Sequence, residues 1–173
     1  NLEVIVVDDC STDHTVDVVE RYVQKDNRLR LIKANLNQGP YVARNLALRE
    51  ATGEFVTVND ADDWSHPEKI EIQVVSLIQD PECLANTSQY CRVFSDLTFY
   101  RRGNYGKYII KNFSSLMFRR QPVLEEIGYW DCVRFSADAD FLERLQQTCE
   151  IQDLQTGPLL FAGQAEDTLT ADK

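Results

Sequence analysis

The chain has 173 residues, with 18 Lys and Arg against 28 Asp and Glu, so its formal net charge is −10. That length and a hydrophobic content of 43% suit one domain with a sizeable core, whereas the acidic balance argues against nucleic acid as a partner. No apolar run approaches the roughly 20 residues of a membrane-spanning helix, and the five cysteines show no C-x-x-C spacing. Fibrous, membrane-spanning, disulfide-scaffold and DNA-binding classes are excluded, and we expect a cytoplasmic protein.

The front of the chain alternates predicted strands with predicted helices. Strands are predicted at residues 2–7, 29–32 and 55–58, the first of them buried on both faces. Apolar side chains at helical spacing indicate one face of each of three helices: Val16, Val19 and Val23; Val42, Leu46 and Ala47; Ile70, Val74 and Ile78. We expect Gly53 to end the second helix as a C′ glycine. This rhythm predicts a mostly parallel sheet in an α/β domain.

The pattern changes after Pro81. Residues 83–118 alternate apolar with polar side chains, which predicts antiparallel strands, and helices are predicted near residues 122–127 and around Phe141, Leu142 and Leu145. No linker or repeat interrupts the chain, so we predict a single domain over residues 1–173.

Three acidic groups follow or flank predicted elements where open α/β sheets bind ligands. The first is the pair Asp8-Asp9 after the first strand. A carboxylate there can accept a hydrogen bond from a base N–H or a ribose hydroxyl. The alternative is that the pair caps the turn at Ser11.

The second group is the run Asp60-Ala61-Asp62-Asp63, which ends the third strand. In an extended segment, positions i and i+2 point to the same side, so Asp60 and Asp62 can converge on one cation. Mg²⁺ and Mn²⁺ prefer such oxygen ligands together with substrate phosphates. The alternative is a solvated acidic turn.

The third group is Ala137-Asp138-Ala139-Asp140 at the start of a helix. One carboxylate can cap the helix, and the helix dipole keeps the other ionised and able to act as a base. Asp140 stands four residues before Arg144, so an ion pair is its simpler interpretation. Trp130 could stack on a sugar ring or lie in the core.

Together these segments resemble the family 2 glycosyltransferases of the GT-A fold. The resemblance is carried by segments that occur in order from about residue 2 to about residue 145: Val4 to Asp13 with Asp8-Asp9, Asn37-Gln38-Gly39 before Ala43-Arg44-Asn45, Gly53 to Val56, Asp60 to Asp63 with His66-Pro67, and Gly128 to Asp131 before Ala137 to Asp140.

The resemblance implies a role for each matching residue. Asp9 would bind the uracil edge of a nucleotide-sugar with Asp8 beside it, and Arg44 would lie near the nucleotide. Asp62 would be the main ligand of a divalent metal, Mn²⁺ or Mg²⁺, and Asp60 would reach the metal or the ribose. Asp138 would be the general base.

The resemblance also sets expectations for the whole chain. Residues 1–80 would form a nucleotide-binding half, a mostly parallel sheet with flanking helices, and residues 81–173 an acceptor-side half with a small antiparallel part. Family members have a strand, a Pro-x-Tyr-Asn type loop and a helix before the strand that opens this chain, so the family's first strand is expected to be missing. The family's later motif usually has Glu where Ala137 stands.

We therefore predict an inverting, metal-dependent glycosyltransferase that moves a sugar from a UDP-sugar to an acceptor hydroxyl, in cell-surface polysaccharide or glycan synthesis. A glycan or lipid-linked acceptor is expected, which would place the protein at a membrane peripherally. Two alternatives are a non-catalytic nucleotide-sugar-binding remnant and a signalling receiver domain with Asp60 as phospho-acceptor. The receiver class needs a lysine commonly followed by proline near a later strand end, and no proline here follows a lysine.

Overall fold

The structure, a computed structural model, describes residues 1–101, 107–111 and 113–163. These residues belong to two compact units. The first comprises residues 1–56 and 119–148, and the second comprises residues 57–118 together with the chain from residue 149. Strand β3 (Phe55–Thr57) reaches the point where the chain leaves the first unit.

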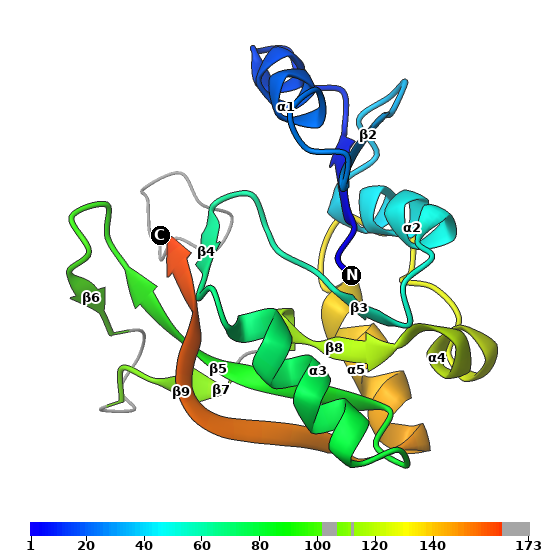
Figure 1. Cartoon of the computed structure of the whole chain (residues 1–173), viewed down its shortest axis with the longest axis vertical. Coiled ribbons are helices and arrows are strands. Elements are labelled where there is room, and N and C mark those ends of the chain that lie inside the picture. Colours follow the sequence, from blue (N-terminus) through cyan, green and yellow to red (C-terminus); the bar gives the residue numbers. More distant parts are fainter. Residues whose placement is uncertain (102–106, 112, 164–173) are drawn as a thin grey trace. The chain divides into compact units, whose positions relative to one another are not determined.

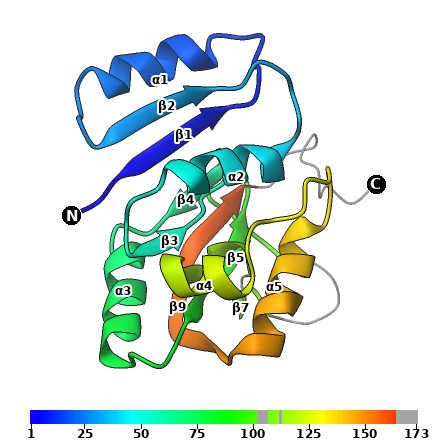
Figure 2. The same cartoon turned by 90° about the vertical axis from the view of Figure 1, so that its right-hand side faces the viewer.

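The first unit is built on a parallel pair of strands. Strand β1 (Val4–Asp8) pairs with β2 (Leu29–Lys33), from Val4 opposite Leu29 to Asp8 opposite Lys33. Helix α1 (Thr15–Val23) lies along one side of the pair and α2 (Pro40–Glu50) along the other (Figure 2). Because β1 and β2 form a sheet of two strands among the described residues, residues 4–7 are half-buried rather than buried on both faces as predicted.

Helix α2 ends earlier than its sequence indicates. Its last residue is Glu50, and the chain turns extended at Ala51, so Gly53 is not the C′ glycine that we expected. Instead the Glu3 carboxylate accepts hydrogen bonds from the N–H groups of Thr52 at 2.7 Å and Gly53 at 2.8 Å. A side chain from the start of β1 therefore holds the backbone that leaves α2.

Two further helices complete the first unit. They are α4 (Arg120–Glu126) and α5 (Ala137–Thr148), close to the helices predicted for these segments. The Arg120 guanidinium donates to the Gly53 carbonyl at 2.7 Å, which anchors α4 to the chain after α2. The buried apolar side chains of this unit include Leu48 of α2, Val123 of α4, Trp130 of the loop before α5, and Phe141 and Leu145 of α5.

The second unit is a mixed sheet with one helix packed on it (Figure 1). The strand order is β8 (Met117–Arg119), β5 (Ala85–Val93), β9 (Ile151–Gly163) and β4 (Asp63–Ser65), and β5 also pairs with β6 (Phe99–Tyr100) and β7 (Ile110–Lys111). A short 3₁₀ turn covers Phe113–Ser115. Strands β6, β7 and β8 are antiparallel to β5, as predicted for residues 83–118. The long strand β9, parallel to β5, was not predicted.

Helix α3 (Lys69–Gln79) buries a different face from the predicted one. The buried positions are Lys69, Gln73 and Leu77, whereas Ile78 is 60% exposed. The Gln73 amide donates to Asn86 Oδ1 at 3.0 Å and to the Ser115 carbonyl at 2.8 Å. These hydrogen bonds use both N–H donors of the buried Gln73 amide, whereas its Oε1 has no partner among the described residues. The polar face of the helix therefore points inward, and the apolar periodicity predicts the wrong face.

No helix among the described residues is long and apolar enough to cross a bilayer.

Candidate functional site

The acidic pair at the end of β1 organises two loops of the first unit. Asp8 is buried, and its carboxylate accepts the Ser11 N–H at 3.3 Å, which is the capping role considered for the pair. The Asp9 carboxylate accepts the N–H groups of Gln38 at 2.9 Å and Gly39 at 2.7 Å. Gly39 has a φ of 93°, a left-handed value that favours glycine. Asp9 thus ties the end of β1 to the loop that opens α2.

Helix α2 carries a tyrosine that reaches the third acidic group. The Tyr41 hydroxyl donates to Asp138 Oδ1 at 2.8 Å, across 97 positions of sequence. Burial and this carboxylate raise the pKa of the Tyr41 phenol, so the hydroxyl keeps the proton that it donates. The Arg44 guanidinium lies 5.1 Å from the centre of the Tyr41 ring. Arg44, Tyr41 and Asp138 are therefore neighbours, a contact that sequence reasoning missed.

Asp138 stands in the first turn of α5, where its Oδ1 also lies 3.0 Å from the Ala139 N–H. Asp140, two residues later, has a different partner. Arg144 Nε donates to Asp140 Oδ2 at 2.8 Å, which confirms the i,i+4 pair proposed from the sequence. The same guanidinium donates to the carbonyls of Ile127 at 2.7 Å and Tyr129 at 3.0 Å. Asp140 therefore orients an arginine that holds the loop before α5.

The same loop is held from α2 by a buried asparagine. Asn45 donates from Nδ2 to the Trp130 carbonyl at 2.7 Å and accepts the Trp130 N–H at 3.1 Å. The indole is 6% exposed and stacks on Phe141 with ring centres 4.6 Å apart. This packing favours the core alternative for Trp130, because a buried ring offers little face to a sugar.

The acidic run of the second unit forms a turn instead of the extended segment that we expected. The Asp63 N–H bonds the Asp60 carbonyl at 3.1 Å, and the Asn59 amide donates to the carbonyls of Asp60 at 2.9 Å and Asp63 at 3.3 Å. A Cβ on Gly163 would lie 2.7 Å from the Asp62 carbonyl oxygen, so β9 passes the turn where only glycine fits. The i,i+2 argument for Asp60 and Asp62 does not apply to this backbone.

Negative charge accumulates in this turn. Burial, followed by repulsion from Asp60 and Asp62, raises the pKa of Asp63 to about 6. No cluster of three or more His, Cys, Asp or Glu side chains is arranged to hold a metal ion among the described residues. Carboxylate oxygens are nonetheless the donors that Mn²⁺ and Mg²⁺ prefer, and these ions often take one or two of them plus substrate phosphates. Asp60 and Asp62 supply oxygen donors of this kind.

Lys69, a second residue that sequence reasoning missed, lies beside this turn. It is 1% exposed at the start of α3. Burial lowers the pKa of its ammonium to about 8, against the opposing influence of the Asp63 and Asp60 carboxylates. The sequence shows a lysine six positions after an acidic run, but it does not show that this lysine is buried.

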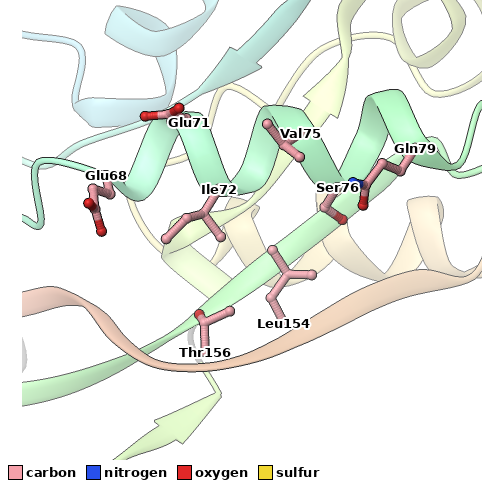
Figure 3. Close-up of a pocket in the computed structure, with 8 residues that line it drawn as sticks. All are labelled: Glu68, Glu71, Ile72, Val75, Ser76, Gln79, Leu154 and Thr156. Atoms are coloured by element: carbon pink, nitrogen blue, oxygen red, sulfur yellow. The ribbon is translucent and has the colours of Figure 1, made fainter.

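An open depression between α3 and β9 contains none of the predicted site residues (Figure 3). Ile72, Val75 and Leu154 line its middle, and Glu68 and Glu71 stand at one end. Two carboxylates beside apolar side chains do not suit a nucleotide diphosphate, so we build the candidate site on the acidic groups instead.

Residues 1–142 match the family described as Glycosyl transferase family 2. The chain belongs to this family. It is 36% identical over 96 residues to the putative teichuronic acid biosynthesis glycosyltransferase TuaG of Bacillus subtilis, covering 56% of this chain and 38% of TuaG. It is 47% identical over 70 residues to the poly(ribitol-phosphate) beta-N-acetylglucosaminyltransferase TarS of Staphylococcus aureus, covering 40% of this chain and 12% of TarS.

Solved structures confirm the predicted GT-A fold. TarS 1–349 of S. aureus, crystallised with UDP-GlcNAc, superposes with a TM-score of 0.75 at 24% identity, covering 96% of this chain and 50% of that one. The mannosyltransferase PcManGT of Pyrobaculum calidifontis, in complex with GDP-Man and Mn²⁺, gives a TM-score of 0.68 at 22% identity, covering 98% and 49%. The chain thus spans half or less of these relatives.

Proposed function

We propose that the protein transfers a sugar from a UDP-sugar to an acceptor hydroxyl, with inversion, in the synthesis of a cell-surface polysaccharide. Family membership supports glycosyl transfer and rules out the receiver-domain alternative. The relative TuaG is named for teichuronic acid biosynthesis, and TarS is named as a poly(ribitol-phosphate) beta-N-acetylglucosaminyltransferase. TarS was crystallised with UDP-GlcNAc. The observation that carries the proposal is the hydrogen bond from Tyr41 to Asp138.

Asp138 would act as the general base. It would accept the acceptor's proton while the hydroxyl oxygen attacks the anomeric carbon and the bond to the diphosphate breaks. The Tyr41 hydroxyl fixes the orientation of the Asp138 carboxylate, which stands in the first turn of α5. One base and one displacement give inversion.

Asp9 and Arg44 would bind the nucleotide. The Asp9 carboxylate already accepts two backbone N–H groups, but each ionised oxygen can accept more than one hydrogen bond. A uracil N–H can therefore add to this set without displacing the loop. Asp8 would stabilise the loop that carries Asp9, because its carboxylate accepts the Ser11 N–H.

Asp62 and Asp60 would hold a divalent cation, Mn²⁺ or Mg²⁺. When bound, the cation neutralises the charge that grows on the departing diphosphate. Asp60 and Asp62 lie in one turn and supply carboxylate oxygens, the donors that such ions prefer. We further propose that residues 1–80 serve the donor and residues 81–173 the acceptor.

A pair of matched substitutions tests the base. Asp138→Asn should lower sugar transfer by about 10²–10⁴-fold with donor affinity nearly intact, because a general base acts only as the proton leaves. Asp140→Asn, the control in the same turn, should leave most of the turnover in place. Transfer and donor binding are measured separately on the complete protein. Full turnover in Asp138→Asn with loss in Asp140→Asn would reassign the base, and donor binding without turnover in the wild type would favour a non-catalytic remnant.

A further inference from the structure

The β5–β6 hairpin of the second unit exposes an unusual group of apolar side chains. Two backbone hydrogen bonds close its turn, both at 2.9 Å. The Phe94 N–H donates to the Thr98 carbonyl, and the Leu97 N–H donates to the Phe94 carbonyl. Leu97 is 75% exposed at the tip, and Phe94, Phe99 and Tyr108 are exposed beside it. Exposed apolar side chains gathered at one tip of a domain mark an interaction site more often than apolar side chains exposed singly.

The backbone at the tip strengthens this interpretation. Leu97 has a φ of 65°, a left-handed value that glycine or asparagine normally supplies. A leucine there costs stability and gains no burial within the unit. The side chain is explained if something outside the chain buries it.

The strand register shows what shape of partner fits. Val93 stands opposite Phe99 and Arg92 opposite Tyr100, so Phe99 and Tyr100 point to opposite faces of the hairpin. On one face, the ring of Phe99 packs against that of Tyr108, with 6.3 Å between the ring centres. On the other face, the rings of Phe94 and Tyr100 pack with their centres 5.3 Å apart. Aromatic side chains on both faces suit a medium that surrounds the tip, whereas a docking protein would cover one face.

The local charge is opposite to that of the whole chain. Residues 92–111 contain five of the 18 Lys and Arg but one of the 28 Asp and Glu. Arg101 and Lys107, both exposed, flank the aromatic residues. Basic side chains next to aromatic and aliphatic ones are the composition of segments that bind anionic lipid surfaces.

We infer that the β5–β6 hairpin is a membrane-contact element that inserts Leu97 and its aromatic neighbours into the interfacial layer of an anionic bilayer. Phe94, Phe99 and Tyr108 lie at the level of the headgroups, and Arg101 and Lys107 contact lipid phosphates. An anionic polymer could satisfy the basic residues, but its polar chain offers no site for a leucine tip. This surface is independent of the proposed sugar transfer.

Vesicle flotation of the 173-residue chain tests the inference. The wild type should float with phosphatidylcholine vesicles that contain phosphatidylglycerol and much less with phosphatidylcholine alone, and added salt should weaken binding. Leu97→Asn should bind about ten-fold more weakly, because a buried leucine side chain is lost. Its melting temperature should not fall, since asparagine tolerates the left-handed backbone.

Leu36→Asn is the matched control, because Leu36 is 69% exposed on the first unit, and it should bind like the wild type. Failure of the wild type to bind anionic vesicles would overturn the inference, including the case in which it binds a soluble polyanion such as polyglycerol phosphate. Equal binding by wild type and Leu97→Asn, or equal losses in both variants, would overturn it as well.

Discussion

Two carboxylates in the first turn of α5 have different partners although they stand two residues apart. Asp138 accepts a hydrogen bond from the Tyr41 phenol, while Asp140 pairs with the Arg144 guanidinium. An uncharged donor orients a carboxylate and leaves its charge in place, whereas a guanidinium neutralises the charge. This difference is the physical reason for placing the base at Asp138.

Removing the phenol hydroxyl should therefore slow catalysis without weakening donor binding. Tyr41→Phe keeps the ring that packs in the unit and deletes the hydrogen bond to Asp138. Because hydrogen bonds to charged groups contribute about 1.5–3 kcal/mol, turnover should fall about ten-fold or more. Steady-state kinetics and donor titration measure the two effects. Tyr22→Phe, at an exposed tyrosine of α1, should change neither, and unchanged turnover in Tyr41→Phe would remove its positioning role.

Asp63 should leave a signature in the pH dependence of stability. Its pKa is about 6 in the folded chain against a usual value of 3.8, chiefly because it is buried. A carboxyl whose folded pKa is raised contributes its full stability below its unfolded pKa and loses it as the pH rises through the folded pKa. In metal-free protein, Asp63→Asn should thus flatten the decline in unfolding free energy between about pH 4 and about pH 6. Denaturant titrations measure it, with Asp17→Asn on α1 as control; an unchanged slope would contradict the assignment.

At the element scale, local patterns predicted most of the helices and strands but not how they bury their faces. The strands near residues 4–8, 29–33 and 55–57 lie close to their predicted positions because short runs of aliphatic, aromatic and β-branched side chains carry a local strand signal. Helix α3 buries Gln73 because Asn86 and Ser115 accept hydrogen bonds from its amide N–H groups, and those partners come from other elements. Apolar periodicity contains no information about such pairs.

The candidate site follows the same rule. The sequence placed Asp8 and Asp9 at the end of a strand, Asp60 and Asp62 after a strand, and Asp138 at the start of a helix. The structure has each of them in that place along the chain. The partners of these residues could not be predicted, since Tyr41 is 97 positions from Asp138. Lys69 and the further contacts of Arg144 were missed for this reason. The turn at Asp60–Asp63 depends on Asn59 and on the glycine of β9, which the extended-strand argument ignored.

The loop before α5 should depend on Arg144 more than on the ion pair. Arg144→Met removes hydrogen bonds to the carbonyls of Ile127 and Tyr129 and should lower the unfolding free energy by about 1–3 kcal/mol. Asp140→Asn removes an i,i+4 pair worth about 0.2–0.5 kcal/mol and leaves those carbonyl contacts. Chemical denaturation of both variants compares the two losses. Equal losses would show that the ion pair, and not the carbonyl contacts, holds the loop.

At the scale of the whole molecule, the chain combines the GT-A fold and a net charge of −10 with the β5–β6 hairpin, whose exposed aromatic side chains lie next to basic ones. It spans 50% of the TarS 1–349 chain with which it superposes, so transfer assays belong on the complete protein. Nucleotide binding can be tested on the 173-residue chain itself, because the residues that we assign to uracil and to the metal all lie within it.

Calorimetric titration of the chain with UDP is the most direct test of the donor site. With Mn²⁺ present, UDP should bind, and it should bind more tightly than GDP if Asp9 accepts from the uracil N–H. Removing the cation with chelator should abolish most of that affinity, and Asp62→Asn should have the same effect with Mn²⁺ present. Equal UDP affinity with Mn²⁺ and with chelator would contradict a metal-dependent UDP-sugar site.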